Sequence, residues 1–240
     1  MPLTKPSVFI DLDNTILDFD WAERRALTAA FREVGLRADP ELLARYNTIN
    51  RLQWELLEDG VLTREQVLLR RFQILFEEKG IRASAAVVGE RYEALLADGY
   101  RFLPGAEKLL RTLFGKYKLY LASNGSASVQ EARIGSSGIA RFFDGIFISE
   151  ELGADKPSKE YFDRCFAQIP SFDPARALMV GDSLTSDIRG GINAGIRTCW
   201  YNPHERIPNR EIRPDFEIRS LDELSPLLDR FFYQGEEQNV

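Results

Sequence analysis

Two aspartates separated by one residue, Asp11 and Asp13, directly follow a short apolar run at residues 8–10. Such a run predicts a buried strand, and the carboxyl end of a strand in an open α/β sheet is where ligands bind. On an extended backbone both carboxylates point to one side, and two adjacent like charges ionise together only beside a cation. One carboxylate can attack phosphorus as a nucleophile while the other carries protons. The pair therefore predicts metal-assisted nucleophilic chemistry, with a hydroxyl donor nearby at Thr15.

Other predicted strands also end in polar residues. A strand-end turn with solvated acids remains an alternative for the first motif, because D-x-D-x-T arises by chance in about one chain in twenty of this length. If the strands are parallel, however, their polar ends meet at one edge of the sheet. The groups that would meet there are Asp11, Asp13, Ser123, Asn124, Lys156, Asp182 and Asp187. Their four carboxylates and one lysine carry a charge of −3, which a divalent cation and one proton would neutralise.

The chain between the first two predicted strands reads as four helices. Apolar residues recur at helical spacing up to Gly35, from Pro40 to about residue 57, after a capping-box sequence at residues 63–66, and from about residue 85 to 98. From residue 104 on, helices alternate with short buried strands. We therefore expect an α/β core domain at residues 1–17 and 100–235, a helical bundle inserted at residues 18–99, and a disordered tail at residues 235–240.

The composition limits the partners. The 240 residues are 44% hydrophobic, enough for one large or two modest globular units, and the net charge of −6 argues against binding a nucleic-acid polymer. No stretch approaches the roughly 18 apolar residues of a membrane span, so a cytoplasmic monomer or homodimer that acts on a small molecule, without a membrane, is expected. Cys165 and Cys199 stand in apolar surroundings and predict reduced core thiols, and His204 predicts a polar surface residue.

Four segments in order resemble the four motifs of the haloacid-dehalogenase-like hydrolases. They are D-L-D-N-T at residues 11–15, A-S-N-G at 122–125, D-K-P-S-K at 155–159 and G-D-S-L-T-S-D at 181–187. The resemblance covers nearly the whole chain, and the helical insert is similar to the α-helical cap of one branch of that family. It implies a Rossmann-like parallel sheet flanked by helices, with the helical bundle as cap.

The same resemblance implies a role for each matching residue. Asp11 would be the nucleophile that forms an aspartyl-phosphate, and Asp13 the general acid and base. Mg²⁺ would be held by Asp11, Asp182 and the main-chain carbonyl of Asp13. Ser123 and the amide of Asn124 would hold phosphate oxygens, and Lys156 would balance charge. Asp187 would orient Lys156 or a metal-bound water, and Thr15 would have a supporting role.

Asp13 also separates the activities known in this family. Dehalogenases of this fold lack an aspartate at that position, so its presence here favours a phosphatase over a 2-haloacid dehalogenase, with a sugar phosphomutase as a weaker competitor. A non-catalytic switch, in which Asp11 is merely phosphorylated, is disfavoured because a neighbouring acid/base makes the phosphoryl group short-lived.

A finer resemblance concerns the substrate. The segments 50–54, 60–72, 148–153 and 190–200 resemble pyrimidine 5′-nucleotidases, which implies a pyrimidine nucleoside or deoxynucleoside monophosphate as substrate. Phosphoglycolate or a sugar phosphate is the alternative. Trp54 could stack on the base and Asn50 could bind its amide edge. Packing of Trp54 in the core of the bundle is equally expected, because a tryptophan at helical spacing usually packs.

Overall fold

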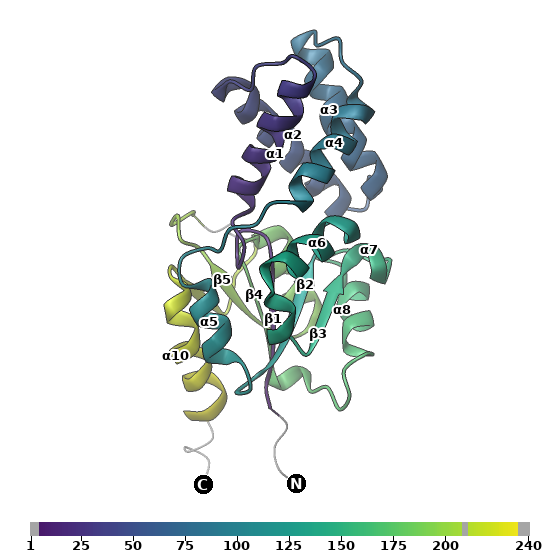
Figure 1. The fold of residues 1–240 in the computed structure, drawn as a ribbon. Helices are drawn as coiled ribbons and strands as arrows, with labels where there is room; N and C mark the ends of the chain where they lie inside the picture. The colour runs from purple at the N-terminus through teal and green to yellow at the C-terminus, as the bar shows by residue number, and fades with distance from the viewer. Residues whose placement is uncertain (1–4, 208–210, 235–240) are drawn as a thin grey trace. The chain divides into compact units, whose positions relative to one another are not determined.

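The computed structural model describes residues 5–207 and 211–234, so the predicted disorder of residues 235–240 lies outside the described residues. The chain divides into two compact units. The first comprises the chain up to Asp18, the segment Phe102–Ala127 and the chain from Ser137 on, and the second comprises Phe19–Arg101 with Ser128–Ser136. Each unit is described separately below (Figure 1).

A parallel sheet is the centre of the first unit. Its strands are β1 (Ser7–Ile10), β2 (Lys118–Ser123), β3 (Gly145–Ile148), β4 (Ala177–Gly181), β5 (Arg197–Tyr201) and β6 (Phe216–Ile218), in the order β3-β2-β1-β4-β5-β6. Every neighbouring pair is parallel, and β1 lies between β2 and β4. All residues of β1 and β4 are buried, as expected where helices cover both faces. The parallel α/β core predicted from the sequence is confirmed.

Helices cover both faces of this sheet. They are α5 (Ala106–Leu113), α7 (Ser149–Leu152), α8 (Lys159–Phe166), α9 (Arg189–Ala194) and α10 (Leu224–Asp229), and α6 (Ala127–Ser137) is shared between the two units. On one face, Phe162 and Cys165 of α8 pack against Phe9 and Met179. On the opposite side Figure 1 shows α5 and α10 next to one another. Cys165 and Cys199 are buried free thiols and His204 is exposed, as predicted.

The segment that leads from β4 into α9 begins with a turn wider than that of an α-helix. One turn of π-helix, Leu184–Ile188, precedes α9, and in it the N–H of Ile188 donates to the carbonyl oxygen of Ser183 at 3.1 Å. The Ser183 side chain caps this turn by accepting from the N–H of Ser186. A five-residue hydrogen-bonded turn is wider than an α-turn and is found mostly at functional sites. Here it brings Asp187 beside the end of β4.

Four helices form the second unit. They are α1 (Phe19–Glu33), α2 (Pro40–Glu58), α3 (Arg64–Lys79) and α4 (Ala85–Ala97). The capping box predicted at Thr63 and Gln66 is present, with both reciprocal hydrogen bonds. The helices pack around an aromatic centre in which Tyr46, Phe72 and Tyr92 contact one another. The helical insert predicted after the first strand is therefore a bundle with its own core.

Candidate active site

The nucleophile candidate Asp11 lies at the carboxyl end of β1, the strand between β2 and β4. Its N–H donates to the carbonyl oxygen of Val180 at 2.9 Å, and the residue is 6% exposed. The chain then leaves the sheet in a tight turn in which Asn14 adopts a φ of 57°, a conformation that asparagine tolerates better than most residues. Asp13 lies in this turn and is half-buried. The two aspartates therefore have different surroundings, one inside the sheet edge and one nearer to solvent.

Lys156 is the cation that faces Asp11. Its Nζ atom donates to Asp11 Oδ1 at 2.8 Å, to Asp187 Oδ1 at 2.7 Å and to the carbonyl oxygen of Ala122 at 2.7 Å. These three bonds use all three ammonium protons, so the side chain has one defined position. At 1% exposure the ammonium group is shielded from water, which makes its charge pairs strong and its removal costly.

The side chain of Asn124 holds Lys156 in place from the backbone. Its Nδ2 donates to the carbonyl oxygen of Lys156, and its Oδ1 accepts from the N–H of Lys156, both at 2.8 Å. Asn124 follows β2 directly, so this pair of bonds ties the loop before α8 to the sheet edge. The family resemblance implied that the amide of Asn124 would hold phosphate oxygens. It did not predict that the side chain of Asn124 would also hold the backbone of Lys156.

Asp187 is brought to the site by the π-turn and by the absence of a side chain at Gly181. A Cβ atom on Gly181 would overlap the Asp187 carboxylate, so only glycine allows that carboxylate to lie over the end of β4. Asp187 Oδ1 accepts from Lys156, and its Oδ2 accepts from the N–H of Ser183 at 3.0 Å. Both oxygens are therefore used in orienting the lysine and the turn.

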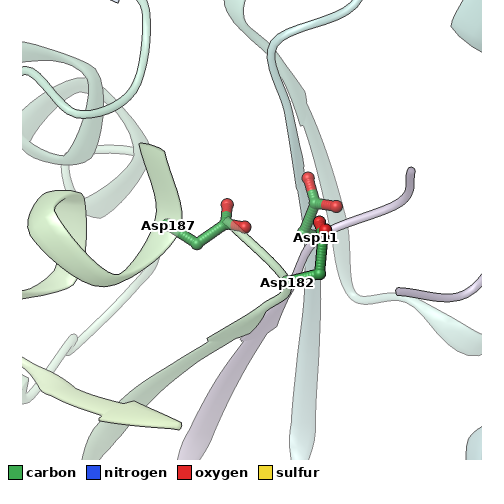
Figure 2. Close-up of side chains that lie close together, drawn as sticks. All are labelled: Asp11, Asp182 and Asp187. Atoms are coloured by element: carbon green, nitrogen blue, oxygen red, sulfur yellow. The ribbon is translucent and has the colours of Figure 1, made fainter. Parts of the chain in front are cut away.

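Asp182 completes an acidic cluster at the ends of two adjacent strands. Oxygens of Asp11, Asp182 and Asp187 all lie within 4.8 Å of one another. Figure 2 shows the carboxylate of Asp187 pointing from the turn after β4 toward the other two. The carbonyl oxygen of Asp182 accepts from Trp200 Nε1 at 2.9 Å and from Arg206 Nη2 at 2.8 Å. Arg206 also donates to Asp182 Oδ2 at 3.2 Å.

The charges of this cluster do not balance without a further cation. Burial raises the pKa of Asp11 well above its usual range, Lys156 opposes that shift, and the neighbouring aspartates add to it. Burial, with Asp187 nearby, raises the pKa of Asp182 to about 7 although Arg206 lowers it. The contacts with Asp11 and Asp187 raise the pKa of Lys156 against the effect of burial. Three carboxylates and Lys156 carry −2, and Arg206, which pairs with Asp182, brings the sum to −1, so the site favours a proton or a divalent cation.

The donor set fits Mg²⁺. Carboxylate and carbonyl oxygens are the ligands that this hard cation prefers. Asp187 is one of the three clustered acids, but both of its oxygens already accept hydrogen bonds from Lys156 and Ser183. Asp11 and Asp182 are therefore the side chains of the cluster best suited to hold the cation. The Oγ1 atom of Thr15 is fully buried without a hydrogen-bond partner among the described residues, an unsatisfied polar group beside this turn.

In the first unit, Lys156 contacts both Asp11 and Asp187, and Asp182 lies beside them. In the second unit, Asn50 and Trp54 contact each other. Ser123, at the end of β2, is 1% exposed and accepts from the N–H of Gly125 through its Oγ. Trp54 is half-buried, donates through Nε1 to Asn50 Oδ1 at 3.1 Å, and has the Arg64 guanidinium 5.7 Å from its ring centroid. Asn50 is 7% exposed.

Some polar residues with a part in these clusters were not predicted from the sequence. Arg206 comes from the loop after β5, a Pro-rich segment without periodicity that would point to a site. In the second unit, Glu23 and Arg71 are buried beside Asn50, although charged residues in an amphipathic helix usually face water. The sequence signal for their burial would have been a charged residue at a position that the helical pattern assigns to the apolar face.

Comparisons with known proteins agree with this geometry. The model of the family described as haloacid dehalogenase-like hydrolase matches residues 6–195. Pyrimidine 5′-nucleotidase PynA of Streptococcus pneumoniae is 37% identical, with 93% of this chain and 94% of the relative covered. Pyrimidine 5′-nucleotidase YjjG of Escherichia coli is 34% identical, with 92% and 96% covered. The crystal structure of the HAD-hydrolase YfnB of Bacillus subtilis, bound to magnesium, matches with a TM-score of 0.89 at 39% identity and covers 95% of this chain and 100% of its own.

No helix among residues 5–207 and 211–234 is both long and apolar enough to cross a membrane.

Proposed function

We propose that this chain, which belongs to the haloacid dehalogenase-like hydrolase family, is a Mg²⁺-dependent phosphomonoester hydrolase that works through an aspartyl-phosphate. The observation that carries the proposal is the buried contact of Lys156 with Asp11 and Asp187 at the edge of the parallel sheet. This contact orients the Asp11 carboxylate as a nucleophile, and a second aspartate, Asp13, lies in the turn that follows.

In the first half-reaction, a carboxylate oxygen of Asp11 attacks the phosphorus atom and the bond from phosphorus to the ester oxygen breaks. Asp13 gives its proton to the leaving oxygen, which departs as an alcohol. In the second half-reaction, Asp13 takes a proton from water, the water oxygen attacks phosphorus, and the bond from phosphorus to Asp11 breaks. Inorganic phosphate leaves, and both aspartates return to their starting states.

The surrounding residues compensate the charge of the phosphoryl group. Lys156 stays protonated throughout because two carboxylates contact its ammonium group. Ser123 and the amide of Asn124 are the donors we assign to the phosphate oxygens. Mg²⁺, held by Asp11, Asp182 and the main-chain carbonyl of Asp13, would neutralise charge on the reacting group. The half-buried position of Asp13 suits a group that must exchange protons with water.

We further propose that the substrate is a pyrimidine nucleoside or deoxynucleoside monophosphate. Two relatives that cover more than nine-tenths of this chain are pyrimidine 5′-nucleotidases, and this chain shares 37% and 34% of its residues with them. Trp54 supports the proposal, because the residue is half-buried rather than enclosed in the bundle. Stacking on such a surface accepts any base of suitable size.

A substrate panel tests both levels of the proposal. We expect Mg²⁺-dependent release of phosphate from uridine and thymidine monophosphates with a higher kcat/KM than from phosphoglycolate, sugar phosphates or an aryl phosphate. A preference for a sugar phosphate would overturn the nucleotidase assignment and leave the phosphatase assignment standing. Absence of phosphate release from every monoester, at protein concentrations where the fold is intact, would overturn both.

Trp54→Ala tests the stacking role. The loss of one base-stacking contact should lower kcat/KM for uridine monophosphate by a factor equivalent to about 1–3 kcal/mol of transition-state stabilisation. The value of kcat/KM for a base-free aryl phosphate should fall less. Leu52→Ala, at an exposed position on the same helix, is the matched control and should leave kcat/KM unchanged for both substrates. Equal losses on both substrates together with a large drop in Tm would show that Trp54 packs the bundle.

A further inference from the structure

A continuous hydrogen-bonded network of polar side chains crosses the core of the helical bundle. It takes one residue from each helix, namely Glu23 of α1, Asn50 of α2, Arg71 of α3 and Glu93 of α4. Asn50 Nδ2 donates to Glu23 Oε1 at 2.9 Å, and Arg71 Nη1 donates to Asn50 Oδ1 at 3.2 Å. Arg71 Nη2 contacts Glu93 Oε1 at 2.5 Å. Figure 1 draws the four helices that carry these residues, α1–α4.

Two of the three charged residues in this network are almost fully buried, and the side chain of the third, Glu93, is 20% exposed. Glu23 is 4% exposed and Arg71 2%, and the guanidinium of Arg71 lies 4.9 Å from the ring centroid of Tyr92. Burial raises the pKa of Glu23 to about 7 although Arg71 lowers it, so part of the desolvation cost remains uncompensated. Apolar residues of similar volume would hold four helices together at least as well. Stability alone therefore gives no reason for these residues, and a role in orienting another side chain does.

The side chain that the network orients is Trp54. The Oε1 atom of Glu23 accepts from Asn50 Nδ2, and this bond fixes the Nδ2 end of the amide. The Oδ1 end then faces two donors, Arg71 Nη1 and Trp54 Nε1. The amide of Asn50 has only one orientation that satisfies these three partners. Its oxygen therefore fixes the indole N–H, and with it the plane of the Trp54 ring.

We propose that Glu23 is a positioning residue that acts through Asn50 to fix the Trp54 ring for stacking on the base of the nucleotide. The inference rests on the proposed nucleotidase function and adds its specificity determinant. Because the indole N–H is used inside the bundle, Trp54 presents its ring surface rather than a hydrogen-bonding edge, which fits tolerance among pyrimidine bases. Asn50 accordingly serves as the link between Glu23 and Trp54 and not as a group that binds the base edge.

The first test compares two substrates in two Glu23 variants. Glu23→Ala should lower the ratio of kcat/KM for uridine monophosphate to that for an aryl phosphate by about tenfold, within the range of one stacking contact. Glu23→Gln should lower it less, because the glutamine oxygen can still accept from Asn50. Glu33→Gln is the matched control, an exposed acid of the same helix that pairs with Arg91 of α4, and should keep the wild-type ratio.

The second test asks whether Glu23 acts through Trp54. In a Trp54→Ala background, Glu23→Ala should cause no further loss in the substrate ratio, because the two changes remove the same interaction. Additive losses, or equal losses on both substrates, would overturn the inference and assign the network to bundle packing. Thermal melts accompany each variant, and if Glu23→Ala does not fold the same cycle is run with Glu23→Gln.

Failure of the proposed function has a different signature. A wild-type enzyme without any preference for uridine monophosphate over the aryl phosphate would refute the nucleotidase assignment, and this inference with it. A wild-type preference that survives in Glu23→Ala would refute only the inference.

Discussion

Replacement of Lys156 by methionine removes the one ammonium group that faces the acidic cluster. The lysine is 1% exposed and contacts Asp11 at 2.8 Å and Asp187 at 2.7 Å. Removal of one partner from a buried ion pair costs about 3–5 kcal/mol, because the charge left behind is uncompensated. We expect a loss of that size in the free energy of unfolding without Mg²⁺ at pH 8.

Mg²⁺ should restore part of this loss. The three clustered carboxylates with Lys156 carry −2, and without it they carry −3. A dication is attracted more strongly to the variant, so we expect Mg²⁺ to bind at least tenfold more tightly. At one fixed Mg²⁺ concentration well above Kd, a tenfold difference is worth about 1.4 kcal/mol of extra stabilisation. Turnover should nevertheless be lost, because the charge that balances the phosphate dianion is missing.

The assay is urea denaturation followed by circular dichroism, with and without Mg²⁺. Lys159→Met provides the control, because this neighbouring lysine is exposed and pairs with Asp163 only on the surface of α8. It should unfold as the wild type does under both conditions. A Lys156→Met protein within 1 kcal/mol of wild type without Mg²⁺, or one that Mg²⁺ stabilises less than wild type, would show that the buried pairs do not have the assigned weight.

Further predictions concern the metal, the two aspartates and the buried glutamate. Activity should vanish with chelator and return with Mg²⁺, and Ca²⁺ should substitute poorly because its looser geometry misplaces the attacking oxygen; full activity after exhaustive chelation would contradict this. Asp11→Asn should abolish both turnover and the phosphorylated intermediate, whereas Asp13→Asn should lower turnover by roughly 10²–10⁴-fold; equal, small effects would contradict the assigned roles. Glu23 has a folded-state pKa of about 7 against 4.5 ordinarily, so the native state keeps a proton that the unfolded chain has released, and stability falls as pH rises between those values. Glu23→Gln lacks this penalty, so its stability relative to wild type should rise by about 2.5 kcal/mol from pH 5 to pH 8 in denaturation curves; a pH-independent difference would argue against the buried carboxylate.

The local sequence was enough to predict the parallel core of the first unit. Runs such as residues 8–10 and 177–180 are apolar throughout, which is typical of strands covered on both faces, and polar residues follow each run directly. In each case the apolar run and the polar residues after it lie within a few residues of one another along the chain. For the same reason the capping box at Thr63 and the four helices of the insert were predicted correctly.

The tertiary structure alone decided which of these groups touch. Lys156 lies 145 residues from Asp11, and the contact exists because β1 pairs with β2 and β4 while Asn124 holds the lysine loop. The sharing of Asp187 between Lys156 and Ser183 depends on a π-turn that has the same residue pattern as an α-helix. The sequence analysis assigned no burial to Glu23 and Arg71, and both are buried because helices from distant segments enclose them. Side-chain partners of this kind depend on packing across the fold, which periodicity within one segment does not specify.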